Sequence, residues 1–350
     1  MTTLRLGTRR SPLALTQSEW VATRLRERGH TVELVEISTF GDETTSQLTT
    51  IGGTGVFAAA IRRALLDGSA DLAVHSLKDL PTTPEPGLVL AAIPPRDDPR
   101  DVLVARDRLT LGELPRGSRV GTGSPRRTAQ LAALGLGITI TPVRGNVDTR
   151  IGFVRSGAFD AVVLARAGLA RLGRLAEVTE TMDPAQMLPA PGQGALAVEC
   201  REDRFDVRAV VADLDDHHTR VCVTAERALL AGLEAGCTAP VGAFAEIGSA
   251  GLSLRGFVGS VDGRSVLRRS LVAELAELAD PASPGRQLAD LLLQEGAAGL
   301  AEPNDNISPG IPIFPRALET TSPPLPTDDP NARPDARPND RPTHHTEQVS

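Results

Sequence analysis

The sequence is short of several residue types, and each shortage excludes a class of protein. It has no tyrosine, one tryptophan and one lysine; Lys and Arg together number 37, so the other 36 basic residues are arginine. Three cysteines, Cys200, Cys222 and Cys237, are too widely spaced for a zinc ribbon or a redox pair. No apolar run approaches the roughly 18 residues that span a membrane. The net charge of −7 argues against a nucleic-acid partner or an anionic membrane partner.

The N-terminal segment bears on the compartment. Residues 1–15 have a strand-like pattern with Arg5, Arg9 and Arg10, and they lack the apolar core and cleavage site of a signal peptide. Together with the odd number of cysteines, this predicts that the protein works in the reducing cytoplasm.

Strand and helix patterns alternate through two successive stretches of the chain. Helix starts are marked by Ser11-Pro12, Ser124-Pro125 and Asn146. The alternation predicts the α/β class, with a doubly wound sheet in each of two lobes. The expected elements are strands over 4–7, 31–39, 72–76, 119–121, 138–144 and 161–165, with helices over 12–29 and 56–66, from 125, over 147–156 and a short one after 165.

The C-terminal third has a different pattern. A helix over 216–233, three antiparallel strands over 241–247, 252–259 and 265–274, and a helix over 286–294 predict a small α+β domain. Eleven prolines lie in the last 50 residues, which predicts a disordered tail in which His344-His345 is solvated. The predicted domains are 1–95 with 195–214, then 96–194, then 215–299, which carries Cys237, and the tail 300–350.

Arginines gather at three strand-to-helix turns. Two of them, Thr8-Arg9-Arg10-Ser11-Pro12 and Thr122-Gly123-Ser124-Pro125-Arg126-Arg127, place an arginine pair beside a Ser-Pro helix start, and the third runs from Arg144 to Arg150. Positive charge at a helix N-terminus opposes the macrodipole and costs about 0.3–1 kcal/mol. A single turn of this kind is better explained by a surface loop with local acidic partners. Three of them favour a polyanionic ligand.

The single lysine lies just beyond an expected buried strand, in His75-Ser76-Leu77-Lys78-Asp79. Chance survival of one lysine on a surface turn is one explanation. The other is a functional pair, in which Asp79 is partly desolvated and kept ionised by Lys78.

Two further motifs differ in what they indicate. Gly52-Gly53-Thr54-Gly55 lacks the Gly-Lys-Ser/Thr ending of a Walker A loop and is interpreted as a tight turn. Cys200 lies in an apolar strand and Cys222 on a helix face, so both are expected in the core. Cys237 lies on a Gly-flanked loop, where a thiol is available for covalent chemistry.

Together these segments resemble the porphobilinogen deaminases, also called hydroxymethylbilane synthases, over about residues 4–298. The resemblance implies three domains, the first two similar to type II periplasmic binding proteins, in a monomer. It implies a dipyrromethane cofactor joined by a thioether to Cys237. It also implies that four porphobilinogen molecules are condensed head to tail, each with loss of ammonia, before hydroxymethylbilane is released by hydrolysis. The motifs that carry it are TRRSPLAL, VHSLKDLP, GTGSPRR, PVRGNVDTR, LARAGLARLG, LPAPGQGALAVECR and LEAGCTAPVGAFA.

The resemblance also implies roles for individual residues. Asp79 is the catalytic carboxylate: it stabilises the positive charge on the pyrrole nitrogen of the azafulvene that loss of ammonia leaves, and it relays protons. No metal is implied. The residues expected to bind cofactor or substrate carboxylates are Lys78, Ser124, Arg126 and Arg127 for the cofactor, and Arg9, Ser11, Arg144, Arg150 and Arg171 for the substrate.

The chain departs from the family pattern at a few positions, and two rival functions stay open. Thr50 and Thr54 stand where basic residues are common, and Pro125 stands where an aliphatic residue is common.

The main rival is a non-enzymatic two-lobed protein that binds an organic anion, which leaves Cys237 and the Lys78-Asp79 pair unexplained. The second is a phosphotransferase, against which the missing Walker A loop counts.

Overall fold

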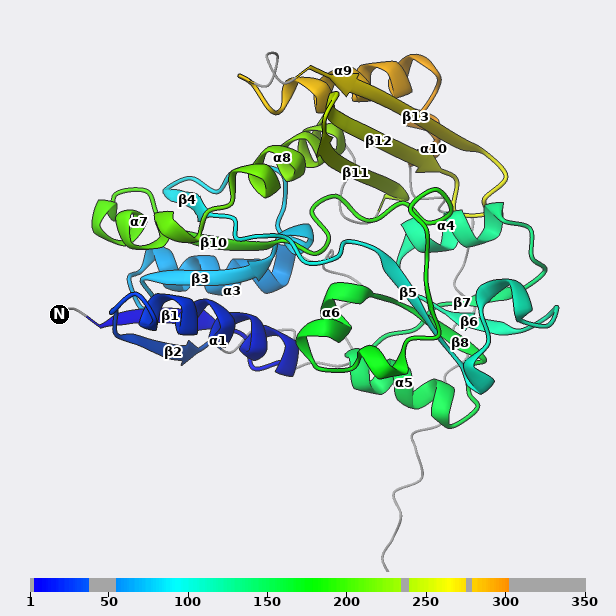
Figure 1. Ribbon diagram of the computed structural model, residues 1–350, viewed down its shortest axis with the longest axis horizontal. Coiled ribbons are helices and arrows are strands. Elements are labelled where there is room, and N and C mark those ends of the chain that lie inside the picture. Colours follow the sequence, from blue (N-terminus) through cyan, green and yellow to red (C-terminus); the bar gives the residue numbers. More distant parts are fainter. Residues whose placement is uncertain (1–2, 38–54, 234–238, 275–278, 302–350) are drawn as a thin grey trace, which may run out of the picture. The chain divides into compact units, whose positions relative to one another are not determined.

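A computed structural model describes residues 3–37, 55–233, 239–274 and 279–301 (Figure 1). Cys237, the loop residues Thr50 and Thr54, and the chain from 302 onward lie outside the described residues. No described helix is both long and apolar enough to cross a membrane.

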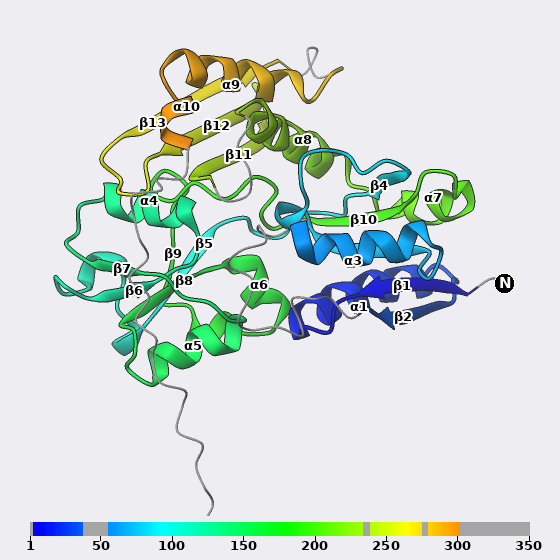
Figure 2. The same cartoon turned by 180° about the vertical axis from the view of Figure 1, so that it is seen from behind.

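The first lobe is built on a five-stranded sheet with the strand order β2-β1-β3-β10-β4. β1 pairs in parallel with β2 and β3, whereas β10 is antiparallel to both of its neighbours. Figures 1 and 2, seen from opposite sides, show α1 and α3 on opposite faces of this sheet. The elements are β1 (Leu4–Thr8), α1 (Pro12–Arg26), β2 (Val32–Glu36), α3 (Gly55–Leu66), β3 (Leu72–Ser76), β4 (Leu88–Ala92), β10 (Leu196–Arg201) and α7 (Phe205–Val211).

The second lobe repeats this scheme with the strand order β7-β6-β8-β5-β9. Here β5 is the strand that runs antiparallel to its neighbours. The elements are β5 (Asp101–Ala105), β6 (Arg119–Gly121), α4 (Pro125–Ala133), β7 (Thr139–Thr141), α5 (Val147–Arg155), β8 (Ala161–Ala165), α6 (Arg166–Arg171) and β9 (Glu180–Thr181).

Both faces of each sheet are buried, as the near-continuous apolar runs in the strands require. In β3, Leu72 and Val74 pack with α1, whereas Ala73 between them packs with Ile61 and Leu65 of α3. Successive strand residues point to opposite faces, so one apolar run supplies two cores. The predicted class of two doubly wound α/β lobes is confirmed.

The third region is a three-stranded antiparallel sheet, β11 (Val241–Gly248), β12 (Gly251–Gly259) and β13 (Val266–Ala273). α8 (His217–Gly232) and α9 (Ser283–Gln294) bury one face of it through residues such as Leu229 and Leu288. On the other face, Phe257 packs with Ala129 of α4. The small α+β domain is therefore confirmed, while the predicted domain boundaries stay a prediction.

One expected strand is much shorter than predicted. The strand expected over 138–144 is only β7, Thr139–Thr141. Pro142 follows it directly and has no N–H to donate to a ladder, so it ends the pairing.

The chain passes between the lobes twice, through residues 93–100 and 188–195, called here the crossing segments. The backbone N–H of Asp97 donates to the carbonyl oxygen of Gly194 at 3.2 Å and joins the two segments. Gly194 has φ +90°, and a Cβ there would lie 2.5 Å from the Asp97 carbonyl oxygen. Only glycine permits both this conformation and so close an approach of the two backbones.

Candidate active site

The paired arginines of the second lobe are fixed by the start of α4. Ser124 is the N-cap, and its Oγ accepts a hydrogen bond from the backbone N–H of Arg127 at 3.5 Å. Pro125 occupies the first helical position, where its missing N–H is not needed. This helix start follows the carboxyl end of β6 and buries Arg126 and Arg127 to 3% and 5% exposure.

One carboxylate lies between these two guanidinium groups. Asp101, at the start of β5, is fully buried. Its Oδ2 accepts from Nη1 of Arg126 at 2.8 Å, and its Oδ1 accepts from Nη2 of Arg127 at 2.7 Å. Burial by itself raises the pKa of Asp101, but the positive charges and hydrogen bonds of the two arginines outweigh burial and hold the pKa below its usual range.

Lys78 reaches the same cluster from the first lobe. It lies in the short 3-10 turn η1 (Leu77–Asp79), directly after β3. Its Nζ donates to Oε1 of Gln193 at 3.2 Å, and Nε2 of Gln193 donates to Oδ1 of Asp101 at 2.8 Å. Although part of the side chain reaches solvent, desolvation lowers the pKa of Lys78 to about 8; nearby arginine charges also lower it, and Asp79 and Asp101 raise it.

Asp79 differs from the expectation. Its side chain is exposed, so the predicted partial desolvation of Asp79 is wrong. The turn η1 directs the lysine inward to Gln193 and leaves the aspartate at the surface. It is the lysine of the pair that is desolvated, and the Asp79 carboxylate acts on it by raising its pKa.

Two more of the predicted arginines are connected to this region. Arg171, at the end of α6, donates to Oδ2 of Asp97 at 2.9 Å and to the carbonyl oxygen of Gly194 at 2.6 Å, one on each crossing segment. Burial, and then the positive charge of Arg127, lowers the pKa of Arg150. Arg150 also donates to the carbonyl oxygen of Gly145 at 2.9 Å.

The remaining predicted residues lie on the turns before α1 and α5. Ser11 caps α1, where its Oγ accepts from the N–H of Ala14 at 3.3 Å. Arg9 is half-buried on the same turn, and Arg144 is exposed before α5. In the described part of the chain, no hydrogen bond joins Ser11 or Arg144 to the cluster around Asp101.

The two cysteines that the structure describes lie in the core, as predicted. Cys200 and Cys222 are free and buried, which confirms them as core residues, and burial raises the pKa of each to about 11. The predicted attachment residue, Cys237, falls outside the described residues. The described ranges contain no group of three His, Cys, Asp or Glu side chains placed to hold a metal ion.

Sequence reasoning missed Asp101, Gln193 and Asp97. Asp101 and Gln193 are 92 positions apart, so nothing local in the sequence pairs them. The sequence offered a partial signal, because Gln193 lies between two glycines, Gly192 and Gly194, and such glycines can mark a close backbone approach. In the structure both glycines have positive φ.

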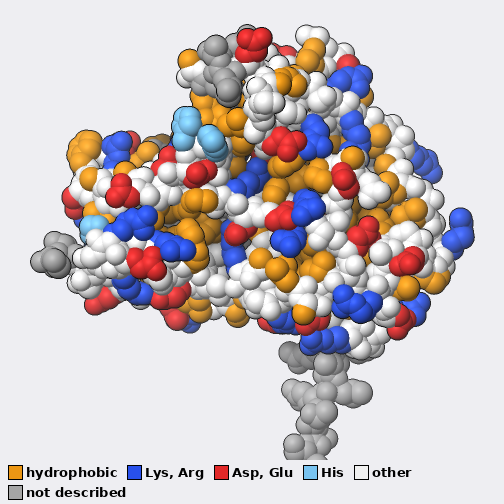
Figure 3. Space-filling view, viewed as in Figure 1, with side chains coloured by type: hydrophobic (Ala, Val, Ile, Leu, Met, Phe, Trp, Pro, Cys, Tyr) orange, Lys and Arg blue, Asp and Glu red, His pale blue; other side chains and the backbone are white. Residues whose placement is uncertain are grey.

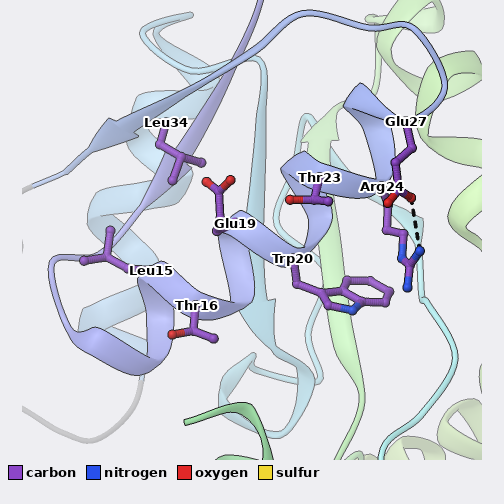
Figure 4. Close-up of a pocket in the computed structure, with 8 residues that line it drawn as sticks. All are labelled: Leu15, Thr16, Glu19, Trp20, Thr23, Arg24, Glu27 and Leu34. Carbon is purple, nitrogen blue, oxygen red and sulfur yellow. Dashed lines mark hydrogen bonds and ion pairs between the residues drawn. The ribbon is translucent and has the colours of Figure 1, made fainter. Parts of the chain in front are cut away.

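The surface outside this cluster is less suited to binding a charged ligand. Figure 3 shows Lys and Arg side chains interspersed with Asp and Glu over one face. Local ion pairs of the protein include Arg201–Asp203 and Arg204–Asp206. A surface depression over α1 is lined by Trp20, Arg24 and neighbours, and its charges pair locally, as Arg24 does with Glu27 (Figure 4).

The cluster is suited to a ligand with several carboxylates. Lys78, Arg126 and Arg127 place three cationic groups around one buried carboxylate, so positive charge is in excess. Nε of Arg126 is buried and has no hydrogen-bond partner among the residues described. A buried donor without an acceptor is costly and calls for an explanation, and an incoming anion is one.

Comparison with known proteins agrees with this chemistry. The family model described as the dipyromethane cofactor binding domain of porphobilinogen deaminase matches residues 4–209, and the C-terminal domain model matches residues 220–294. Porphobilinogen deaminase 1 of Streptomyces coelicolor is 57% identical over 308 residues, covering 85% of this chain and 97% of that protein. Porphobilinogen deaminase of Mycobacterium tuberculosis is 59% identical over 276 residues, covering 76% and 89%.

Among solved structures, a periplasmic substrate-binding protein of an ABC transporter from Coxiella burnetii is similar at 15% identity with a TM-score of 0.39, covering 60% of this chain and 91% of that chain. A score this low adds nothing to the fold already described. The sequence relatives and the two matched domains are decisive: the chain belongs to the porphobilinogen deaminase family.

Proposed function

We propose that Asp79, Cys237 and the cationic cluster around Asp101 carry the reaction of this family in the present chain. The protein is a porphobilinogen deaminase, a transferase of tetrapyrrole biosynthesis that uses a dipyrromethane cofactor. It condenses four porphobilinogen molecules with loss of ammonia and releases hydroxymethylbilane by hydrolysis. The observation that carries our assignment of residues is the excess of positive charge where Lys78 meets the buried pair Arg126 and Arg127.

The residues of the cluster fit the cofactor. Pyrroles of this pathway carry acetate and propionate side chains, so a dipyrromethane is a polycarboxylate. Arg126 and Arg127 carry guanidinium groups, which pair well with carboxylates, and Lys78 presents a point charge. We assign these three residues, with Ser124 at the helix start, to the cofactor carboxylates. When bound, the dipyrromethane supplies the terminal pyrrole to which substrate units are joined.

The other arginines are assigned to the carboxylates of the substrate and the growing chain. The positive charge of Arg127 contributes to lowering the pKa of Arg150, which supports a location beside the cofactor arginines. Arg171 lies against both crossing segments. Arg9, Ser11 and Arg144 lie on helix-start turns, where N–H groups and guanidinium forks attract anions.

Asp79 is assigned to the chemical step. As ammonia leaves the aminomethyl carbon of porphobilinogen, positive charge spreads to the pyrrole nitrogen. A carboxylate that accepts a hydrogen bond from this N–H stabilises the charge as it develops. The exposure of Asp79 supports this role, because the carboxylate is available to a ligand, and Lys78 beside it supplies a compensating charge.

Cys237 is assigned as the attachment point, and it gives the direct test. Intact mass of the purified protein, with a peptide map of the Cys237 segment, should show an added dipyrromethane on this cysteine. Cys237→Ser should carry no covalent addition, whereas Cys222→Ser should be loaded normally because Cys222 is buried in the core. A loaded Cys237→Ser protein contradicts the assignment.

A non-enzymatic anion-binding protein, the rival function, is not favoured by the family match. The same mass experiment separates the two, because a binding protein acquires no covalent addition when porphobilinogen is supplied. We further propose that the protein is a cytoplasmic monomer. Sedimentation of the loaded protein tests the oligomeric state.

A further inference from the structure

The carboxylate of Asp101 receives more hydrogen bonds than any assigned function explains. It is fully buried and accepts from Arg126, from Nε and Nη2 of Arg127 at 3.2 and 2.7 Å, and from Gln193. Its donors come from α4 and from the second crossing segment. A buried anion enclosed in this way is not available to a carboxylate ligand, which it would repel.

Arg126 and Arg127 depend on this carboxylate for their location. They are adjacent, buried and at a helix N-terminus, where their charges repel one another and oppose the macrodipole. Burial lowers the pKa of Arg126, and Asp101 opposes that effect. Without Asp101, two buried cations would lose their shared partner, and both long side chains could turn toward solvent.

The influence of Asp101 extends to the first lobe through Gln193. The amide Nε2 of Gln193 donates to Asp101 at 2.8 Å and to the carbonyl oxygen of Pro99 at 2.7 Å. With both donor positions used, Oε1 is directed to Lys78. Gln193 is 1% exposed, so no solvent competes for its amide.

We propose that Asp101 is a positioning residue of the deaminase site: it holds Arg126 and Arg127 in place to receive cofactor carboxylates and, through Gln193, orients Lys78 toward the same ligand. This rests on the proposed assignment of those three cations. Asp101 itself contacts neither cofactor nor substrate. Its single charge leaves the cluster cationic while keeping the cations from repelling each other out of place.

The test compares Asp101→Asn with Asp71→Asn. Asp71 is the matched control: it is 6% exposed and also pairs with two arginines, Arg5 and Arg204, but in the first lobe. Both variants should lose stability, because each leaves two arginines without their carboxylate. Only Asp101→Asn should lower the loaded fraction in the intact mass and raise KM for porphobilinogen about tenfold or more.

A pH profile gives a readout that loss of stability does not move. Because the Asp101 charge favours protonated Lys78, its removal should shift the alkaline limb of kcat/KM to lower pH. Asp71→Asn should leave that limb unchanged. If Asp101→Asn matches Asp71→Asn in loading, KM and pH profile, the positioning role is wrong.

Two further variants keep the outcome decisive. If Asp101→Asn does not fold, Gln193→Met keeps Asp101 and its two arginines but removes the amide that joins Asp101 to Lys78, together with the bond of this amide to Pro99. Because protonated Lys78 then loses its acceptor, the alkaline limb should shift to lower pH, and an unshifted limb overturns the proposal. Arg126→Gln and Arg127→Gln test the proposed function separately. If they load and turn over normally, the assignment of cations fails; if they do not, while Asp101→Asn behaves like Asp71→Asn, only the inference fails.

Discussion

The ammonium nitrogen of Lys78 lies 3.2 Å from Oε1 of Gln193, so the single lysine of the chain is held by the segment that returns from the second lobe to the first. The backbone N–H of Leu77 donates to the carbonyl oxygen of Ala195 at 3.0 Å and fixes the same turn. The lysine is thus oriented by two bonds to one crossing segment. A flexible side chain held in this way is suited to recognising a ligand group at a fixed place.

The first prediction concerns the pH dependence of substrate binding. The pKa of Lys78 is lowered to about 8, chiefly by desolvation, so the charge that attracts carboxylates is present below pH 8 and lost as the pH rises through that value. Lys78 is assigned to the carboxylates of the cofactor, whose terminal pyrrole is the group that the substrate joins. Loss of its charge should misplace that pyrrole, and KM for porphobilinogen should therefore rise above pH 8. Lys78→Gln should raise KM about tenfold or more at neutral pH, the strength of a charged hydrogen bond, and should remove this dependence.

Lys78→Arg is the companion variant, because a guanidinium stays charged through the whole range. If it binds substrate at all, its KM should be flat between pH 7 and pH 9.5. An alkaline rise of KM that persists unchanged in both variants would show that another group titrates. Steady-state kinetics over this range, on protein with its cofactor attached, supplies the measurement.

The second prediction separates chemistry from cofactor attachment. Asp79→Asn should reduce kcat by at least about 10²-fold, because the amide cannot stabilise the developing positive charge or relay protons. Its intact mass should still show the cofactor, since the cofactor carboxylates are assigned to the cations and not to Asp79. The control is Asp213→Asn, an exposed aspartate elsewhere in the first lobe, which should keep normal kcat. Near-normal turnover in Asp79→Asn would remove the assigned role.

Much of the fold could be predicted from local sequence signals. Ser11-Pro12, Ser124-Pro125 and Asn146 each cap the helix they predicted, and the strands at 72–76, 119–121 and 161–165 have the expected bounds. Helix caps and buried apolar runs are fixed by neighbours a few residues away, so they can be read from one sequence. The strand predicted over 138–144 is too long, because Pro142 cannot donate to a ladder and ends the pairing at Thr141.

The site could be predicted only in part, because its polar contacts are long-range. The cationic residues stand out through their motifs, but their partners Asp101 and Gln193 lie 25 and 115 positions from Arg126 and Lys78. The expected desolvation of Asp79 failed for a related reason. Which of two adjacent side chains points inward depends on a partner across the fold, here Gln193.

The third prediction concerns stability at the base of the third domain. Glu226 of α8 is fully buried and accepts from both Nη atoms of Arg96 and from the N–H groups of Gly192 and Ala245. Glu226→Gln should lower the free energy of unfolding by about 3–5 kcal/mol, because the largely buried Arg96 loses its counter-charge and an amide NH₂ faces other donors.

The control for this prediction is Glu246→Gln. Glu246 pairs with Arg255 at the surface, where its side chain is 57% exposed. Its loss should cost at most about 1 kcal/mol. Urea unfolding of both variants measures the difference, and equal losses would mean that the buried network contributes no more than a surface pair.

The fourth prediction is a loss of stability in acid that originates in the first lobe. Glu199 of β10 is 3% exposed, accepts from Nε and Nη2 of Arg62 at 3.0 and 2.8 Å, and lies 3.2 Å from Nε2 of His75. Burial raises its pKa, but the hydrogen bonds and charges of His75 and Arg62 outweigh burial and lower the pKa to about 2. In the unfolded chain the pKa of a glutamate is about 4.3.

A carboxyl group whose pKa is lowered by folding stabilises the protein above its unfolded pKa, and this contribution is lost as the pH falls toward the folded pKa. The contribution of Glu199 should therefore be complete above about pH 5 and decline between about pH 4.3 and pH 2, by an amount on the order of 3 kcal/mol in total. The free energy of urea unfolding, compared between wild type and Glu199→Gln at pH 6, 4 and 3, should show a difference that shrinks as the pH falls.

The control is Glu295→Gln, which removes a surface partner of Arg269 and should show a small difference that does not change with pH in this way. If the Glu199→Gln difference is the same at all three pH values, folding does not lower the pKa of Glu199, and its pairing with Arg62 and His75 contributes no pH-dependent stability.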